Sequence, residues 1–185
     1  MRSLCERLVS AVALFFLFPL LLLVLLAVRL ESSGPGFFRQ VRVGRHRRPF
    51  ICYKIRTMAQ GTPEAGTHEV AASAVTRVGR FLRTTKLDEL PQLINVARGE
   101  MAFVGPRPCL PSQVELVEAR DRLGIFEVLP GITGLGQVRG IDMSDPDRLA
   151  RCDGEYVSAR NLRLDLSILW ATFRGAGGGD RVKSA

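Results

Sequence analysis

Two adjacent carboxylates, Asp88 and Glu89, lie between Lys86 and Pro91 and are the residues of this chain best suited to chemistry. Adjacent carboxylates repel each other unless a shared cation or surrounding basic groups relieve the repulsion. A hard divalent cation such as Mg2+ binds oxygen ligands, usually one or two carboxylates together with substrate phosphates. A carboxylate can also be a nucleophile, as in aspartyl-phosphate chemistry. The pair therefore predicts a metal site or a nucleophile, and its plainer interpretation is a solvated helix start.

Basic residues of the kind that bind phosphate accompany this pair along the chain. The net charge is +8, and residues 39–56 hold seven Lys or Arg and no acid. Such a cluster beside a membrane segment attracts anionic lipid headgroups, and it can equally bind a phosphorylated substrate. Nucleic acid is disfavoured, because few aromatic residues alternate with the charges and an apolar anchor precedes them. The candidate hydrogen-bond donors to phosphate are Lys54, Arg56, Arg80, Arg83 and Arg107.

An apolar block from Ser10 to Val28 precedes the basic region and contains 19 consecutive uncharged residues. A signal peptide is disfavoured, because the block is too long and no small-residue cleavage site follows it. A spanning helix needs about 20 apolar residues, and the length fits. Pro19 kinks a helix near the middle, into halves of roughly 14 Å, less than half of the ~30 Å hydrocarbon core. Basic residues flank both sides, so charge asymmetry does not separate a spanning helix from a re-entrant one.

Chemistry based on histidine or cysteine is disfavoured. The chain has two histidines, His46 in the basic cluster and His68 in a weakly patterned segment. Its cysteines show no spacing typical of a zinc site, and scattered thiols in a chain of 185 residues do not indicate a disulfide framework. We expect reduced thiols that act as small buried residues: Cys5, Cys52, Cys109 and Cys152.

The elements that must position these residues are short. Phe37–Gln40 and Pro49–Ile55 are predicted to be extended. Val75–Val96 carries apolar residues at helical spacing, and Thr85, three residues before Asp88, resembles a helix N-cap. Pro91 then requires either a kink or a helix that begins there.

Proline and glycine divide the second half of the chain. Gly105–Pro108 is predicted to be a rigid extended loop, and Pro130–Gly140 a glycine-rich loop region. Helices are predicted over residues 111–123, from Asp145-Pro146 onward, and over 161–173. In the last helix a broad apolar face suits either the core, which we favour slightly, or a membrane interface; its residues are Leu162, Leu166, Leu169, Trp170 and Phe173. Residues 59–74 are predicted to be a loop or weak helix, and 175–185 a flexible tail.

Five segments in this order resemble the bacterial sugar transferase family, the small monotopic polyprenyl-phosphate phosphoglycosyl transferases. The resemblance extends from the anchor to about Phe173, and the order of the motifs makes it specific. The segments are Phe37-Phe38-Arg39-Gln40, Lys54-Ile55-Arg56-Thr57-Met58, Leu87-Asp88-Glu89-Leu90-Pro91-Gln92-Leu93, Val104-Gly105-Pro106-Arg107-Pro108 and Pro130-Gly131-Ile132-Thr133-Gly134.

The resemblance implies a reaction in which a nucleotide sugar, usually a UDP-sugar, donates sugar-1-phosphate to undecaprenyl phosphate and releases UMP. This step initiates glycan assembly at the bacterial inner membrane, with the catalytic domain on the cytosolic face. It implies Asp88 as the nucleophile that forms a covalent sugar-phosphoryl aspartate, and Glu89, with Asp88, as the ligands of Mg2+. Cations suit this chemistry, because two anionic substrates must meet.

The resemblance also suggests roles for the other polar residues. Contacts to diphosphate or nucleotide are assigned to Lys54, Arg56, Arg83 and Arg107. Gln137 and Arg139 lie in the loop that resembles the nucleotide-side loop, where Arg139 replaces the usual Asn. Arg39 and Arg42 are candidates for lipid phosphate or headgroups, and Asp153 matches an acidic family position without an assigned role.

The expected fold is an α-rich α+β domain with few short strands and interfacial amphipathic helices. The family's anchor is a re-entrant helix broken at Ser-Pro; here Phe18-Pro19 keeps the proline alone. We expect a membrane-anchoring helix over residues 1–30, a catalytic domain over 31–174 and a tail over 175–185. The length leaves no room for the extra spanning helices of the larger subfamily. The alternative function is a non-catalytic, membrane-tethered basic module that binds anionic lipid or nucleotide, supported by residues 39–56 alone.

Overall fold

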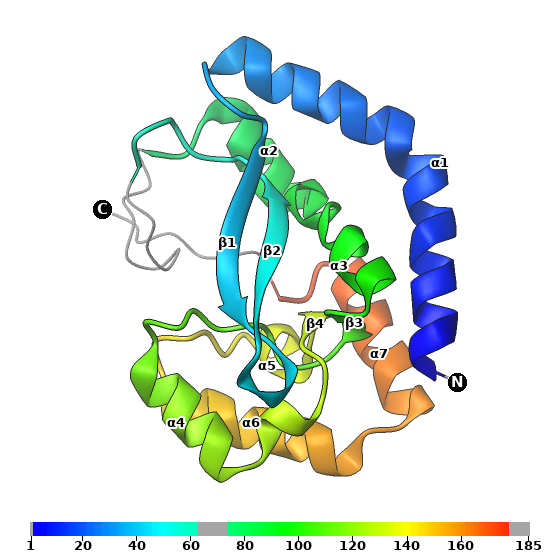
Figure 1. The fold of residues 1–185 in the computed structure, drawn as a ribbon, viewed down its shortest axis with the longest axis vertical. Helices are drawn as coiled ribbons and strands as arrows, with labels where there is room; N and C mark the ends of the chain where they lie inside the picture. The colour runs from blue at the N-terminus through cyan, green and yellow to red at the C-terminus, as the bar shows by residue number, and fades with distance from the viewer. Residues whose placement is uncertain (1, 63–73, 178–185) are drawn as a thin grey trace.

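The computed structural model describes residues 2–62 and 74–177 of the chain. It is rich in helices and has two small two-stranded sheets, which confirms the expected α-rich α+β class. Most of the segment predicted as a loop or weak helix over 59–74, and most of the predicted tail, lie outside the described residues. Figure 1 shows a long first helix along one flank, with a hairpin and the shorter helices beside it.

Helix α1 (Arg2–Glu31) is continuous and contains Pro19 near its middle. Figure 1 shows that the helix bends, as expected where a proline removes a backbone donor and clashes with the preceding turn. Before the proline, Ser10 Oγ donates to Leu93 O at 2.6 Å and Arg7 Nε to Ala97 O at 3.0 Å. Both halves of α1 therefore contact the domain, because a second set of contacts follows the proline: Leu21, Val24 and Val28 pack with Ile55 and Leu82.

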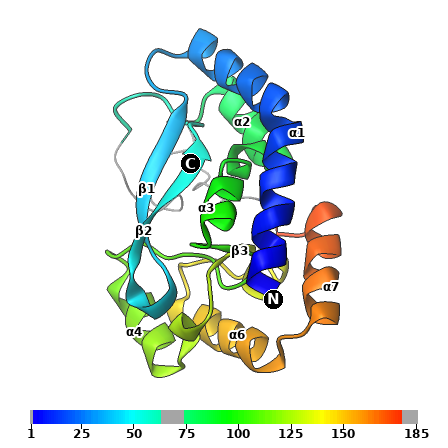
Figure 2. The same ribbon diagram turned by 45° about the vertical axis from the view of Figure 1, so that its right-hand side comes forward.

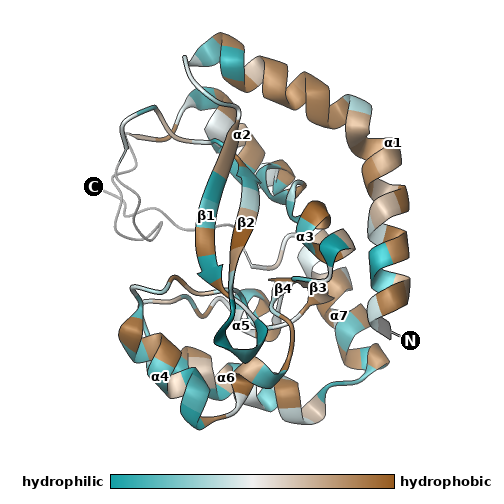
Figure 3. Ribbon diagram, in the orientation of Figure 1, coloured by the Kyte–Doolittle hydropathy of each residue, from teal (hydrophilic) through white to brown (hydrophobic). Residues whose placement is uncertain are grey.

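The outer face of α1 is apolar and exposed, as the brown colour of most of the helix indicates in Figure 3. Among the described residues it is the one helix long and apolar enough to cross a membrane. Only 17% of its most apolar window is buried, so α1 is not the core helix of a water-soluble fold.

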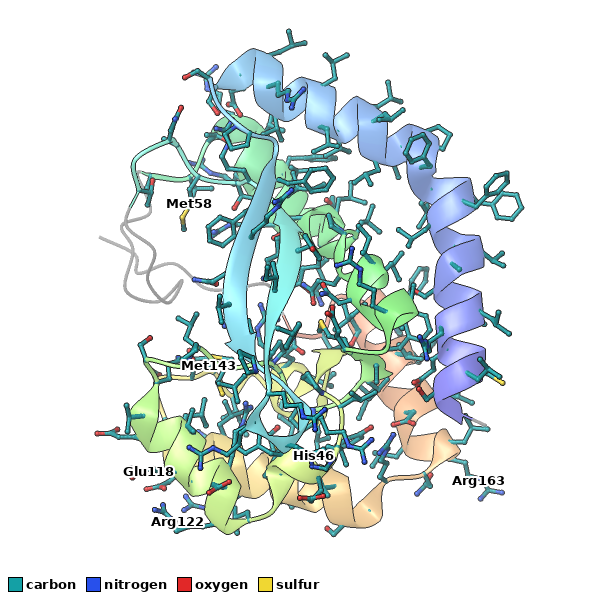
Figure 4. All side chains as sticks on the ribbon, viewed as in Figure 1. His46, Met58, Glu118, Arg122, Met143 and Arg163 are labelled. Carbon is teal, nitrogen blue, oxygen red and sulfur yellow. The ribbon has the colours of Figure 1, made fainter. Side chains whose placement is uncertain are left out.

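A hairpin connects α1 to the remainder of the domain. Strand β1 (Phe37–Val43) pairs antiparallel with β2 (Pro49–Ile55), with Phe37 opposite Ile55. The predicted strands are confirmed, and the first is three residues longer than expected. The tight turn is η1 (Arg45–Arg47), and Figure 4 labels its His46 at the end of the hairpin.

The region predicted as one helical pattern over Val75–Val96 is divided into three pieces. These are α2 (Arg77–Thr85), the single turn η4 (Leu87–Glu89) and α3 (Gln92–Arg98). The predicted N-cap at Thr85 is wrong, because Thr85 ends α2 and its Oγ1 donates to Phe81 O at 2.9 Å. The N-cap of α2 is Thr76, whose Oγ1 accepts from Gly79 N. Of the alternatives at Pro91, a helix that begins there is confirmed.

The segment predicted as a glycine-rich loop region contains regular structure. Strand β4 (Gly131–Thr133) pairs parallel with β3 (Ala102–Val104), and α5 (Leu135–Val138) follows. The glycines allow backbones to approach each other: a Cβ on Gly131 would lie 2.1 Å from Gly105 N, and one on Gly134 would lie 2.2 Å from Gly105 O. Their role is close packing of two chain segments rather than loop freedom.

Three further helices lie where the sequence predicted them: α4 (Val114–Arg122), α6 (Pro146–Ala159) with Asp145 as its N-cap, and α7 (Leu162–Phe173) with Asn161 as its N-cap. The short η5 (Ile125–Glu127) was not predicted. Helices α4 and α6 share a core cluster that includes Leu116, Leu149 and Ala150. All four cysteines are free, and the expectation that they act as small buried residues is confirmed for Cys52, Cys109 and Cys152 but wrong for Cys5, which is exposed on α1.

Helix α7 corrects one prediction. The apolar face favoured as core is exposed, with Trp170 61% and Phe173 83% exposed, and their rings stack. Asp165 and Ile168 form the buried side instead. Helical spacing gives the same pattern for a face that packs on the core and one that meets lipid, so the sequence could not separate them. In Figures 1 and 2, α7 lies on the same side of the molecule as the N-terminal half of α1.

Candidate active site

The turn η4 carries the carboxylate pair between α2 and α3. Lys86, the C-cap of α2, has a left-handed backbone conformation that reverses the chain into this turn. Asp88 is buried, and the Glu89 side chain is 14% exposed. The interpretation as a solvated helix start is therefore wrong for this pair, because both carboxylates lie largely inside the protein.

Glu89 joins two of the predicted cations. Lys54 Nζ from β2 and Arg107 Nη2 from the loop after β3 each lie 3.0 Å from Glu89 Oε1. Their side chains are 15% and 16% exposed. The structure thus brings Lys54, Glu89 and Arg107 together from three separate elements, beside Asp88. Partly buried charges attract phosphate more strongly than the same charges in water.

Arg83 and Arg56 approach the site differently. Arg83, in the last turn of α2, donates from Nε to Thr57 Oγ1 at 2.8 Å. Arg56 donates from Nη2 to Ser32 O at 2.7 Å and to Ser32 Oγ at 2.9 Å, just after α1 ends. The structure therefore uses the Arg56 guanidinium to hold the end of α1, while Arg83 contacts the segment that follows β2.

The hairpin arginines separate into one exposed and one buried residue. Arg39 is exposed on β1, as a contact to lipid headgroups requires. Arg42 is buried, donating to Pro108 O at 3.0 Å and to Gln40 Oε1 at 2.6 Å. The expectation that Arg42 contacts lipid headgroups is not supported by this placement, because the guanidinium instead fixes the backbone next to Arg107.

Asp153 pairs with a residue that the sequence did not single out. Arg120 Nε and Nη2 donate to Asp153 Oδ2 at 3.0 and 2.6 Å, with the two side chains 2% and 3% exposed. Arg120 Nη1 donates to Arg107 O at 2.7 Å. Burial raises the pKa of Asp153, and Arg120 opposes this rise. The pair thus holds the loop that presents Arg107 to Glu89.

Gln137 and Arg139 lie at α5. Gln137 is half-buried, and Arg139 is exposed and pairs with Glu155 of α6. No group of three His, Cys, Asp or Glu that could form a metal cage occurs among residues 2–62 and 74–177. Two adjacent carboxylates still suit Mg2+, which is commonly held by one or two carboxylates with substrate phosphates completing the shell.

The fold thus combines a turn of two largely buried carboxylates, joined to Lys54 and Arg107 through Glu89, with a long helix whose exposed apolar face suits a membrane. The chain matches the family model described as "Bacterial sugar transferase" over residues 1–177. It belongs to this family.

Relatives that are named as sugar transferases resemble this chain over most of its length. It is 42% identical over 174 residues to the UDP-glucose:undecaprenyl-phosphate glucose-1-phosphate transferase of Caulobacter vibrioides, covering 89% of this chain and 65% of that protein. It is 38% identical over 155 residues to the uncharacterized sugar transferase EpsL of Bacillus subtilis, covering 84% and 76%. It is 36% identical over 159 residues to the undecaprenyl-phosphate galactose phosphotransferase of Salmonella typhimurium, covering 77% and 33%. The chain thus spans slightly less than two thirds of the Caulobacter protein and about one third of the Salmonella protein.

Proposed function

We propose that this protein transfers sugar-1-phosphate from a UDP-sugar to undecaprenyl phosphate and releases UMP, which initiates assembly of a bacterial glycan. The observation that carries the proposal is the clamp of Lys54 and Arg107 on Glu89, directly beside the buried Asp88. The names of the Caulobacter and Salmonella relatives give undecaprenyl phosphate as the acceptor, and the first gives UDP-glucose as the donor. Their names disagree on the sugar, so the sugar is left open.

In the proposed first step, an Asp88 carboxylate oxygen attacks the phosphorus that bears the sugar. A P–O bond to Asp88 forms, the bond from that phosphorus to the bridging oxygen breaks, and UMP leaves with the electron pair. In the second step an oxygen of undecaprenyl phosphate attacks the same phosphorus and regenerates the Asp88 carboxylate. Lys54 and Arg107 stabilise the negative charge of the diphosphate as it redistributes. Splitting the transfer in two lets the soluble nucleotide leave before the lipid reacts.

Mg2+ is proposed as the cofactor, with Asp88 and Glu89 as its protein ligands. When bound, the ion would neutralise phosphate charge and make UMP a better leaving group. Lys54 and Arg107 hold the Glu89 carboxyl in place from two directions. The remaining ligands would come from substrate phosphate and water, as is usual for this ion.

We also propose that α1 enters the cytoplasmic leaflet and returns, so that the catalytic domain remains on the cytosolic face. The support is that residues on both sides of Pro19 contact the domain: Ser10 and Arg7 through α3, and Leu21, Val24 and Val28 through the core. A straight helix perpendicular to the membrane would meet a cytosolic domain at one end only. The exposed apolar face of α7 is proposed to lie at the same interface.

Cys5 tests this topology without an added label site, because it is exposed while the other three cysteines are buried. If α1 is re-entrant, a membrane-impermeant maleimide labels Cys5 in inverted membrane vesicles and leaves it unlabelled in intact spheroplasts. Ser112→Cys in a Cys5→Ser background is the reference for the cytosolic face, since Ser112 is exposed on the domain. Labelling of Cys5 in spheroplasts alone would show that α1 spans the membrane.

Trp170, the one tryptophan of the chain, reports on α7. If the exposed face of α7 lies at headgroup level, vesicles shift Trp170 emission to shorter wavelength, and a nitroxide on a lipid headgroup quenches it more than one deep in the acyl chain. Phe173→Ser, which removes the stacked neighbour from the same face, should weaken the quenching. A Trp170 emission spectrum that vesicles leave unchanged would contradict the placement of α7 at the membrane interface.

The experiment that tests the proposed activity is a screen for UMP release. Purified protein is mixed with Mg2+, undecaprenyl phosphate and a panel of UDP-sugars, with parallel reactions in EDTA. The expected result is UMP release from one or a few UDP-sugars, lost in EDTA and restored by added Mg2+. The alternative, a non-catalytic basic module, requires that no UDP-sugar yields UMP. Salt-sensitive binding to anionic liposomes that survives replacement of both Asp88 and Glu89 would then favour it.

A further inference from the structure

Lys86 has an unusual backbone conformation for its residue type. It ends α2 with φ 58° and ψ 16°, in the left-handed region where a helix most often places glycine or asparagine. Steric contact between the Cβ and the following carbonyl disfavours this region for residues other than glycine. Any residue at this position makes the same backbone hydrogen bonds, from its N–H to Arg83 O and Leu82 O, so these bonds do not account for a lysine here. Residues held in such conformations cluster at functional sites, and Lys86 lies two residues before Asp88.

The Lys86 ammonium belongs to the same group of charges as the carboxylate pair. The side chain is half-buried, and its Nζ donates to Ala176 O at 2.8 Å. Burial lowers the pKa of Lys86; Glu89 opposes this effect and Arg107 adds to it. Lys86 is also the N-cap of η4, and Glu89 N donates to Lys86 O at 3.2 Å, so Lys86 belongs to the same turn as the two carboxylates. The phosphate contacts suggested by the sequence involve Lys54, Arg83 and Arg107, and Lys86 is not one of these residues.

The segment Gly175–Gly177, which supplies the acceptor of this hydrogen bond, is fixed at both sides. It follows α7 directly, where Ala176 N donates to Ala171 O at 2.9 Å. Gly177 has φ +68° and lies against α5, so that a Cβ on it would be 2.7 Å from Gln137 O. The Ala176 carbonyl is therefore held in one position. Because an ammonium has three N–H donors, this carbonyl orients Lys86 and takes up one of them.

We propose that Lys86 binds a phosphate oxygen of the nucleotide-sugar donor, with its ammonium oriented by the Ala176 carbonyl. The proposal rests on the proposed function, which supplies the diphosphate. The three cations Lys54, Lys86 and Arg107 outnumber the two carboxylates of the turn by one, so the group keeps a positive charge that attracts a diphosphate. An ammonium close to a phosphate in a partly buried site forms a charge-assisted hydrogen bond, the stronger kind.

The test measures binding of UDP to the full-length protein in detergent by titration calorimetry. Lys86→Met should weaken UDP binding about tenfold at low salt, the size expected for one charge-assisted hydrogen bond. Lys86→Arg should remain within about threefold of wild type, because it restores the charge. At about 0.5 M NaCl the loss in Lys86→Met should shrink, since salt screens the lost charge. Arg122→Met, on the outer side of α4 in Figure 4, is the control for removing one positive charge.

Gly177→Ala tests the orienting carbonyl separately. The added Cβ must displace the segment from Gln137, so UDP binding should weaken about threefold in wild type and not at all in the Lys86→Met background. Full additivity of the two effects would overturn the orienting role of Ala176. Equal affinity of Lys86→Met and wild type, or equal losses in Lys86→Met and Lys86→Arg at both salt concentrations, would overturn phosphate binding by Lys86. If wild-type protein binds no UDP, the proposed function itself fails, and this proposal with it.

Discussion

Replacement of Asp88 by Asn should lower the rate of UMP release by about 10⁴-fold or more, the size of effect seen when a covalent nucleophile is removed. The substitution keeps the size of the side chain and its ability to accept a hydrogen bond, but an amide oxygen is a poor nucleophile. The ion pairs of Glu89 with Lys54 and Arg107 remain, so UDP binding measured without Mg2+, of which Asp88 is a proposed ligand, should change little by comparison. A large loss in rate with near-normal UDP affinity therefore assigns the effect to chemistry rather than to binding.

The covalent intermediate gives this prediction a direct readout. Without undecaprenyl phosphate, wild-type protein and a productive UDP-sugar should release UMP in a single burst and retain a sugar-phosphate on the peptide that contains Asp88, detected by mass spectrometry. Asp121→Asn is the matched control, because Asp121 undergoes the same chemical change at an exposed position, where it pairs with Arg47. Turnover of Asp88→Asn at the wild-type rate, or an adduct on another residue, would sink the assignment of Asp88 as nucleophile.

Local features of the sequence predicted most of the elements correctly. The two strands of the hairpin and the helices over residues 146–159 and 162–173 follow from short extended stretches, the helical spacing of apolar residues and Pro146 in a first helical turn, which act over a few positions. The glycine-rich segment 130–140 was misjudged because its glycines serve contact with Gly105, about 25 residues earlier in the chain. Periodicity alone cannot reveal what a glycine or an apolar face packs against.

In the candidate site, too, features that depend on neighbouring residues were predicted, and contacts between distant parts of the chain were not. The Asp-Glu pair and the cations Lys54 and Arg107 were recognised from residue type and order, and the structure joins them through Glu89. Arg120 was missed, because in the stretch Val114–Arg122 it stands among charged residues and its partner Asp153 lies 33 positions away. A sequence separation of this size leaves no local signal. Two arginines of one helix, Arg120 and Arg122, thus have opposite environments that their sequence positions do not distinguish.

Replacement of Arg120 by Met should destabilise the protein by about 3–5 kcal/mol, because it leaves the Asp153 carboxylate buried without its cation. In detergent this corresponds to a fall of about 10 °C in the midpoint of thermal unfolding. Arg122→Met, the same change at a side chain that is 67% exposed, should shift the midpoint by about 2 °C or less. Equal shifts in the two variants would contradict a buried, compensating role for Arg120.

The pH dependence of the Arg120→Met variant has a defined sign. Burial already raises the pKa of Asp153, and loss of the opposing Arg120 raises it further. A carboxyl whose pKa is higher in the folded state than in the unfolded state favours folding when protonated, and this contribution is lost as the pH rises through the folded-state pKa. The deficit of the variant relative to wild type should therefore shrink as the pH is lowered from 7 toward 5. If the loss of stability of the variant instead grows as the pH is lowered, the buried Asp153 carboxylate is not the cause of that loss.

The double variant Arg120→Met/Asp153→Leu separates stability from function at this pair. Replacing both members of a buried ion pair by apolar side chains is often neutral for stability, so most of the unfolding midpoint should return. UMP release should remain low, because the double variant still lacks the Arg120 guanidinium that holds Arg107 O at 2.7 Å. If the rate recovers together with the midpoint, the pair stabilises the fold without positioning Arg107. Recovery of the midpoint alone, without recovery of the rate, makes Arg120 a positioning residue. Its buried guanidinium then serves to direct Arg107 toward Glu89.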